Sequence, residues 1–207
     1  MLAILSGAVT TLLLSAAAIL LGLPMGLGLA LIRWAHTPVA TQLVAAFVSL
    51  LRATPLVTLV LLLFFALPNA GVSVGPIAAA VIALTLNTSA FNCEIWRAAL
   101  IDFPKDQIEA AQSVGMSRFA YLRRIVLPQV TRSSLPILVS EMSQVIKVTP
   151  VLAVVGVVEI TRAAVRVGAE NYEPLPPFLF ALAIYMPIIY ALLWLQRRLQ
   201  QRSELAA

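Results

Sequence analysis

The sequence of 207 residues is 61% apolar and only 11% charged, with a mean hydropathy of +0.97. Because an average soluble domain carries about 25% charged residues, this composition excludes a soluble globule, and it equally excludes a disordered chain. The net charge of +5 does not indicate nucleic-acid binding, since the basic residues lie between long apolar stretches and are not interleaved with aromatic ones.

Long apolar stretches dominate the chain from one end to the other. A helix needs about 20 mostly apolar residues to cross the hydrocarbon core of a bilayer. In chain order, the stretches that meet this requirement are 7–32, 42–67, 75–95, 135–158 and 177–195. The sequence therefore predicts an all-α membrane protein with five transmembrane helices, which form a single domain over 1–207.

The distribution of lysine and arginine predicts the orientation of these helices. Positively charged loops stay on the cytoplasmic side. One set of loops and chain ends carries ten basic residues, and the other carries only Arg162 and Arg166. The ten are Arg33, Arg97, Lys105, Arg118, Arg123, Arg124, Arg132, Arg197, Arg198 and Arg202. We therefore expect the N-terminus outside, the C-terminus in the cytoplasm and the long loop 102–128 in the cytoplasm.

The loop 102–128 carries signals for two short helices. Pro104 suits the first position of a helix, and Gly115 can adopt the left-handed conformation that ends one. Ser117 can cap a second helix that reaches about Val126, where Pro128 is expected to stop it. Two short helices joined at a glycine form a compact projection, which could fit a groove on another protein.

The same loop contains Glu109-Ala110-Ala111 followed by Gly115, a spacing that resembles the EAA loop of permease subunits in ATP-binding-cassette importers. Three further segments resemble motifs of that family in the same order. They are 52–56 (Arg-Ala-Thr-Pro-Leu), 147–150 (Lys-Val-Thr-Pro) and 159–162 (Glu-Ile-Thr-Arg). Together they resemble the branch that imports polar amino acids and opines across the bacterial inner membrane.

The resemblance implies a type I importer permease fold (the MetI-like fold) and a set of partners. These are a second permease subunit, two cytoplasmic ATPases and a periplasmic solute-binding protein. The family's EAA loop docks into a cleft on the ATPase, so the resemblance assigns ATPase coupling to Glu109, Ala110, Ala111 and Gly115. An ordinary amphipathic loop on the membrane surface remains the alternative for this segment.

Polar residues inside the fourth predicted helix are candidates for a substrate path, because a charge at mid-bilayer costs on the order of 3 kcal/mol. Glu141 and Gln144 share one helical face, and Ser140, Ser143 and Lys147 share the neighbouring one. In the resembling family, a glutamate at this position and an acidic residue at that of Val148 hold a cationic amino acid. Val148 departs from that pattern. Two interpretations of Glu141 stay open, namely lining of the path and packing between helices.

Other charged residues carry more local expectations. Glu94 and Arg97 should form an ion pair, and Arg52 should either snorkel to the headgroups or anchor the fold. The charges between 159 and 176, including Glu159, suit either docking of a periplasmic partner or a plain solvated loop. The only histidine, His36, has no second ligand nearby, so we expect no metal site.

The sequence contains no phosphate-binding G-x-x-x-x-G-K-[ST] motif and no hydrolase motif, so we expect neither a bound cofactor nor an enzyme. Energy for transport must then come from a partner that binds ATP. The alternative is an autonomous ion-coupled carrier of small solutes, for which 207 residues without a repeat are few. The sequence does not reveal which amino acid or opine is carried, or whether the second permease subunit is identical.

Overall fold

A computed structural model describes residues 1–35 and 37–204, and His36 lies outside them. The described chain folds into helices only, in agreement with the predicted class. The elements are α1 (Leu2–Trp34), α2 (Pro38–Ala53), α3 (Leu56–Asn69), α4 (Pro76–Ile101), α5 (Lys105–Ser113), α6 (Arg118–Tyr121), the π-helical turn η1 (Leu122–Val126), α7 (Leu127–Val148), the 3-10 segment η2 (Thr149–Val155), α8 (Ile160–Asn171) and α9 (Leu175–Glu204).

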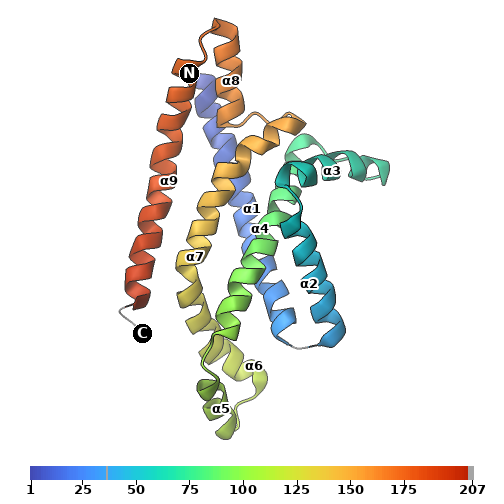
Figure 1. The fold of residues 1–207 in the computed structure, drawn as a ribbon, viewed down its shortest axis with the longest axis vertical. Coiled ribbons are helices and arrows are strands. Elements are labelled where there is room, and N and C mark those ends of the chain that lie inside the picture. The colour runs from blue at the N-terminus through green and yellow to red at the C-terminus, as the bar shows by residue number, and fades with distance from the viewer. Residues whose placement is uncertain (36, 205–207) are drawn as a thin grey trace.

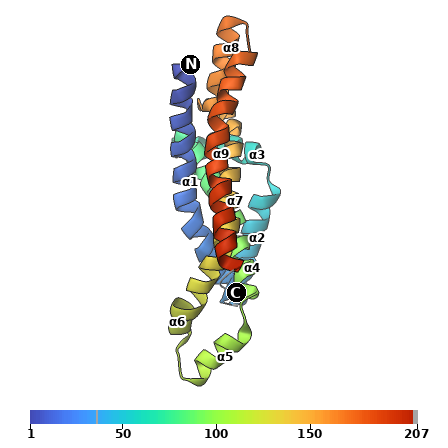
Figure 2. The same cartoon turned by 90° about the vertical axis from the view of Figure 1, so that its left-hand side faces the viewer.

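Helices α1 and α4 form the centre of the molecule and run side by side (Figures 1 and 2). Glycines let them approach closely: a Cβ atom added to Gly26 would lie 2.7 Å from Cβ of Asn92, and one added to Gly22 would lie 2.9 Å from the Thr88 methyl group. Helix α1 therefore packs closely against α4 at these two positions. Gly28 makes no such contact, because no atom of another helix lies within 4 Å of an added Cβ.

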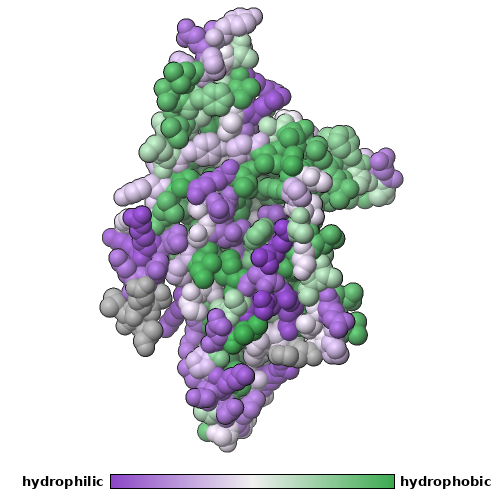
Figure 3. Space-filling view, in the orientation of Figure 1, coloured by the Kyte–Doolittle hydropathy of each residue, from purple (hydrophilic) through white to green (hydrophobic). Residues whose placement is uncertain are grey.

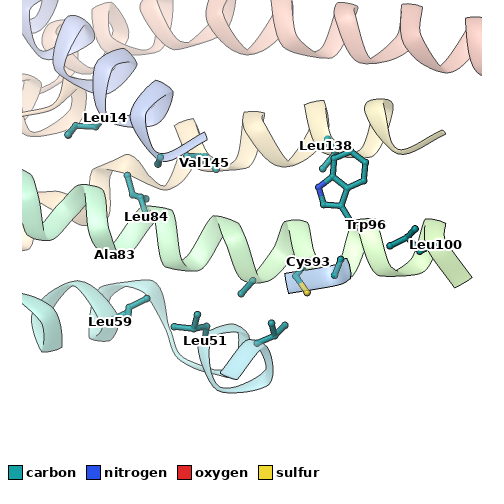
Figure 4. Close-up of a cluster of buried hydrophobic side chains, with 14 of the residues drawn as sticks. Leu14, Leu51, Leu59, Ala83, Leu84, Cys93, Trp96, Leu100, Leu138 and Val145 are labelled. Atoms are coloured by element: carbon teal, nitrogen blue, oxygen red, sulfur yellow. The ribbon is translucent and has the colours of Figure 1, made fainter. Parts of the chain in front are cut away.

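The apolar core follows the same central pair. Leu14 of α1, Leu84 and Trp96 of α4, and Leu138 and Val145 of α7 are buried in one cluster, shown in Figure 4. Cys93 is fully buried in this cluster, where it packs as a small apolar residue. The core thus joins the first, third and fourth predicted spans into one body.

The second predicted span is not a single helix. The segment 42–67 was expected to be continuous, but α2 ends at Ala53 and α3 begins at Leu56, and the two are bent by 107°. Pro55 has no N–H to donate, and it keeps the preceding Thr54 extended at φ −87° and ψ 125°. As a result α3 projects sideways from the other helices (Figure 1).

The predicted stop at Pro128 is wrong, because the chain stays helical from Arg118 to Val155. A proline in the first turn of an α-helix removes no backbone hydrogen bond, and Pro128 lies in the first turn of α7 after the π-helical turn. The fourth span therefore starts earlier than residue 135, and one helical rod joins the projecting loop to the membrane region.

Four described helical segments are long and apolar enough to span a membrane, and a fifth span exists if α2 and α3 are counted as one broken span. The expected five spans are matched in this sense. Apolar residues cover the projecting α3 and much of the upper surface in Figure 3, while the lower end, at α5 and α6, is mostly hydrophilic. Such a division is typical of a membrane protein with one large polar projection.

Helix α8 lies at the end of the molecule opposite to α5 and α6 (Figure 1). Its N-cap, Glu159, is fully buried and accepts hydrogen bonds from the backbone N–H groups of Thr161 (2.8 Å) and Arg162 (2.6 Å). The expectation that Glu159 belongs to an accessible charged loop is therefore wrong. A carboxylate at a helix N-terminus satisfies N–H groups that otherwise lack partners, and this requirement holds Glu159 inside.

Candidate functional site

A cavity of about 290 Å³ opens where the break between α2 and α3 meets α4 and α7. Charged, amide and hydroxyl side chains line it together with apolar ones. The lining residues are Arg52, Thr54 and Leu56 around the break, Leu84, Asn87, Thr88 and Phe91 from α4, and Glu141, Gln144, Val145 and Val148 from α7. A mixed lining of this kind suits a small polar molecule with apolar parts.

Two of the five predicted path residues, Glu141 and Gln144, line this cavity. The other three do not. Ser143 is buried and donates a 2.7 Å hydrogen bond to the backbone oxygen of Ser140, while Lys147 is exposed and does not line the cavity. The structure thus separates the two faces of the polar helix and brings only the Glu141 face to the cavity.

Sequence reasoning missed Arg52 as a member of the site. The signal that could have found Arg52 is its position three residues before Pro55, since a proline inside an apolar stretch can expose backbone and neighbouring polar groups to a cavity. The sequence leaves two roles open for Asn87, namely lining of the path and hydrogen bonding across helices. Its place in the cavity depends on which face of α4 meets α7, and this packing is not visible in the sequence.

Arg52 also belongs to an ion cluster just beside the cavity. The carboxylate of Glu94 pairs with Arg33 of α1 and with Arg97 (2.7 Å), and an Arg52 nitrogen lies 4.0 Å from it. The predicted pair of Glu94 with Arg97 is therefore confirmed, and the anchoring interpretation of Arg52 is favoured. The Arg52 guanidinium also lies over the Phe91 ring, 5.4 Å from its centre, so it links the cluster to the cavity lining.

The projecting loop places the predicted coupling residues on two different faces. Glu109, Ala110 and Gly115 are exposed, whereas Ala111 is only 4% exposed and packs into the core cluster. Gly115 has φ +77° and ends α5, and the Met116 N–H bonds back to the Ala111 oxygen at 3.1 Å. The left-handed glycine that the sequence predicted is confirmed.

Two hydrogen bonds fix the loop to the rod that follows it. The Ser117 hydroxyl accepts from the Ala120 N–H at 3.3 Å, as predicted for an N-cap. The amide of Gln129, on α7, donates to the side-chain oxygen of Gln107, on α5, at 2.8 Å. Movement of the exposed face of α5 would therefore be passed to α7, which carries the cavity residues.

Comparison with known proteins supports a transport role. Residues 18–204 match the family described as binding-protein-dependent transport system inner membrane component. The chain is 35% identical to the probable glutamine ABC transporter permease protein GlnP of Bacillus subtilis, an alignment that covers 95% of this chain and 92% of that protein. It is 33% identical to the nopaline transport system permease protein NocM of Agrobacterium fabrum, covering 87% and 79% of the two chains.

Solved structures agree with the sequence relatives. A crystal structure of an amino acid ABC transporter with histidines superimposes with a TM-score of 0.88 at 29% identity, covering 97% of this chain and 94% of that one. The inward-facing methionine ABC transporter MetNI superimposes with a TM-score of 0.81 at 19% identity, over 98% and 97% of the two chains, and shows the shared fold. The chain therefore belongs to the binding-protein-dependent inner membrane components, as a multi-pass permease subunit of an ABC importer that is not itself an ATPase and leaves ATP to a partner subunit.

Proposed function

We propose that this chain forms half of the translocation path for polar amino acids or opines, and that the cavity between α4 and α7 is part of that path. The observation that carries the proposal is the presence of Arg52 and Glu141, groups of opposite charge, in one cavity between membrane-spanning helices. An amino acid in its zwitterionic form has the matching pair of charges. The glutamine and nopaline permeases among its relatives support the same class of substrate.

The proposal includes a second permease subunit, either a copy of this chain or a sister chain. The outer face of α3 supports it, because Leu62 and Phe65 are 57% and 63% exposed there beside the polar Thr58 and Asn69. Within the described chain, helix α3 packs chiefly against α4 and η2, and the side with Leu62 and Phe65 stays exposed. A second subunit against this side would close the cavity toward the lipid.

We further propose that the loop 102–128 contacts one of two cytoplasmic ATPases, with Glu109, Ala110 and Gly115 on the contact surface. Their exposure supports this role. Ala111 would act from inside, because it packs the loop helix against its own core. The loop and the C-terminal end of α9 lie toward the same end of the molecule, away from α8 (Figure 1), and this agrees with an N-terminus outside and a cytoplasmic C-terminus.

Uptake by proteoliposomes tests the proposed function. The complete importer, reconstituted with its partner ATPase and its binding protein, should accumulate at least one polar amino acid or opine in the presence of ATP. Omission of the ATPase should abolish uptake. Uptake by the chain alone, driven by a proton or sodium gradient, would contradict the proposal and favour an autonomous ion-coupled carrier.

A further inference from the structure

Helix α1 ends against the loop 102–128. Trp34 is the last residue of α1, and the guanidinium of Arg118, the first residue of α6, lies over the Trp34 ring, 5.3 Å from its centre. A cation over the face of an indole ring is attracted by the partial negative charge of that face. The contact therefore joins the loop to a helix that is distant in sequence but lies beside it in the fold (Figures 1 and 2).

The same end of α1 is tied to the core. Trp34 is partly buried and packs against the core cluster. Its neighbour Arg33 pairs with Glu94 of α4, and the two side chains are only 17% and 20% exposed. A partly buried ion pair is screened little by salt. A displacement of Trp34 therefore moves Arg33 and, through the ion pair, α4.

The opposite end of α1 is fixed to α8. The hydroxyl of Thr11, which is fully buried, accepts from the Ile160 N–H at 3.3 Å. The backbone there is also in close contact, because a Cβ atom added to Gly7 would lie 2.8 Å from the Glu159 oxygen. Helix α1 has 33 residues and is therefore about 50 Å long. One helix thus contacts the loop 102–128 at one end and the start of α8 at the other.

This link through α1 is separate from the one through α7. The π-helical turn η1 lies between α6 and α7, and the Leu127 N–H after it bonds to the Leu122 oxygen. Pro128 follows and has no N–H for the Arg124 oxygen. Helices bend at π-turns and at prolines. A movement of α6 is therefore only partly passed to α7, and the contact with Trp34 gives it a second route into the membrane region.

We propose that Arg118 is a positioning residue of the transport cycle, which passes movement of the loop 102–128 through Trp34 to α1 and, along α1, to α8. The inference rests on the proposed contact between this loop and an ATPase, and it deepens that proposal by naming the contact that carries the movement. When the ATPase changes conformation on binding ATP, α6 moves with the loop. The attraction between the guanidinium and the ring then draws the end of α1 along.

The first test observes Trp34 directly and needs no transported substrate. The permease is labelled with 5-fluorotryptophan and assembled with unlabelled ATPase in nanodiscs. The fluorine signal of Trp34 is assigned with the variants Trp96→Phe and Trp194→Phe. Addition of AMP-PNP should shift this signal, and Arg118→Gln should reduce the shift by about threefold, which is what a cation–π contact at a partly exposed site is worth. No shift in the wild type, or an equal shift in Arg118→Gln, would overturn the proposal.

The second test measures whether the contact serves transport. ATP hydrolysis is compared with and without the binding protein loaded with the amino acid or opine that the uptake assay identifies. Arg118→Gln and Trp34→Leu should each lower this stimulation, per bound ATPase, by about threefold. The double variant should lower it no further, because both substitutions remove the same contact. Arg118→Lys keeps a cation and should retain part of the stimulation.

Arg198→Gln is the matched control. Its guanidinium lies over the Trp194 ring on α9, 3.9 Å from the ring centre, in a contact that does not involve the loop 102–128. This variant should keep the wild-type stimulation and the wild-type shift of the Trp34 signal. An equal loss from Arg198→Gln would overturn the proposal, because any lost arginine would then have the same effect.

The remaining outcomes separate this inference from the proposed function. Additive losses in the double variant would mean that Arg118 acts without Trp34, and wild-type stimulation in Arg118→Gln would mean that it does not position α1. Either result overturns the inference and leaves the proposed function intact. A wild-type chain that binds no ATPase would instead contradict the proposed function. If Trp34→Leu does not assemble, the first test decides, since it leaves Trp34 in place.

Discussion

The phenolic hydroxyl of Tyr185, on α9, donates a 3.1 Å hydrogen bond to the carboxylate of Glu159, which caps α8. Residues that are distant in sequence thus meet at the end of the molecule opposite to the coupling loop. Helix α1 joins them there, because the Thr11 hydroxyl accepts from the Ile160 N–H at 3.3 Å and Gly7 lies against the Glu159 backbone. Glu159 therefore connects α1, α8 and α9 through one buried carboxylate.

Replacement of Glu159 by alanine should destabilise this end of the molecule by about 2–4 kcal/mol, since it removes a helix cap and leaves buried donors without an acceptor. Glu159→Gln keeps one side-chain oxygen and should cost less. Thermal unfolding of the purified complex in detergent measures both effects. The matched control is Glu170→Ala on the exposed side of the same helix, which should leave the unfolding temperature unchanged. Equal effects at both positions would contradict the capping role.

The contact between α1 and α4 predicts that alanine at Gly26 and alanine at Gly28 change the stability of the protein very differently. Gly26→Ala should destabilise the protein by about 1–3 kcal/mol, because the new methyl group would lie 2.7 Å from Asn92 Cβ and 2.9 Å from the Ser89 oxygen. Gly28→Ala meets no atom within 4 Å and should be neutral or slightly stabilising. Unfolding temperatures of the two variants, measured in the same detergent, should therefore move in different directions. A similar loss at both would mean that helix packing does not decide the effect.

Much of the fold was predictable, because the length of an apolar stretch and the need for a positive φ angle depend only on neighbouring residues. The span lengths, the left-handed Gly115 and the Ser117 cap each depend on a few neighbouring residues. The break at Pro55 was missed because a proline in an apolar stretch is compatible with a kinked span as well as with two separate helices. The packing of α3 against α4 and η2, together with Pro55, accompanies the sharp bend, and this packing is not visible in the sequence.

The sequence predicted which polar residues share a face of α7, but not which of these faces meets α4. The spacing of Glu141 and Gln144 placed them together, and the structure agrees. The neighbouring face with Lys147 had a similar polar pattern, so the sequence could not say which of the two meets α4. Glu159 was misjudged for a related reason: a charged residue outside the apolar stretches is usually solvated, and only the tertiary fold brings Tyr185 and the α8 N-terminus around it.

Substitution of Gly115 should weaken the association with the ATPase by straining the backbone. No atom lies within 4 Å of an added Cβ, so a side chain at this position would not clash, but φ +77° costs about 1–2 kcal/mol for most residues. Gly115→Val should therefore reorient α5 and lower the amount of ATPase that co-purifies, whereas Gly115→Asn should retain more, since asparagine tolerates this conformation.

Gly71 supplies the matched control for Gly115. It has φ +85°, equally open space around it and the same type of helix-ending hydrogen bond, from the Val72 N–H to the Leu67 oxygen at 3.0 Å. Because it follows α3 and is distant from the coupling loop, Gly71→Val should leave ATPase association at the wild-type level. A loss of ATPase from both valine variants would indicate general misfolding, and no loss from Gly115→Val would count against the coupling role of the loop.

Glu141→Gln tests whether the charge in the cavity serves transport or packing. The amide has nearly the same shape, so helix packing should be retained and the unfolding temperature should change little, while the counter-charge for a substrate ammonium is lost. Uptake by the complete importer should therefore fall, mainly through a higher KM, by about tenfold if one charge-assisted hydrogen bond is removed. The matched control is Lys147→Gln, which removes an exposed charge on α7 that does not line the cavity and should keep the KM. Unchanged uptake by Glu141→Gln combined with a lower unfolding temperature would assign Glu141 to packing.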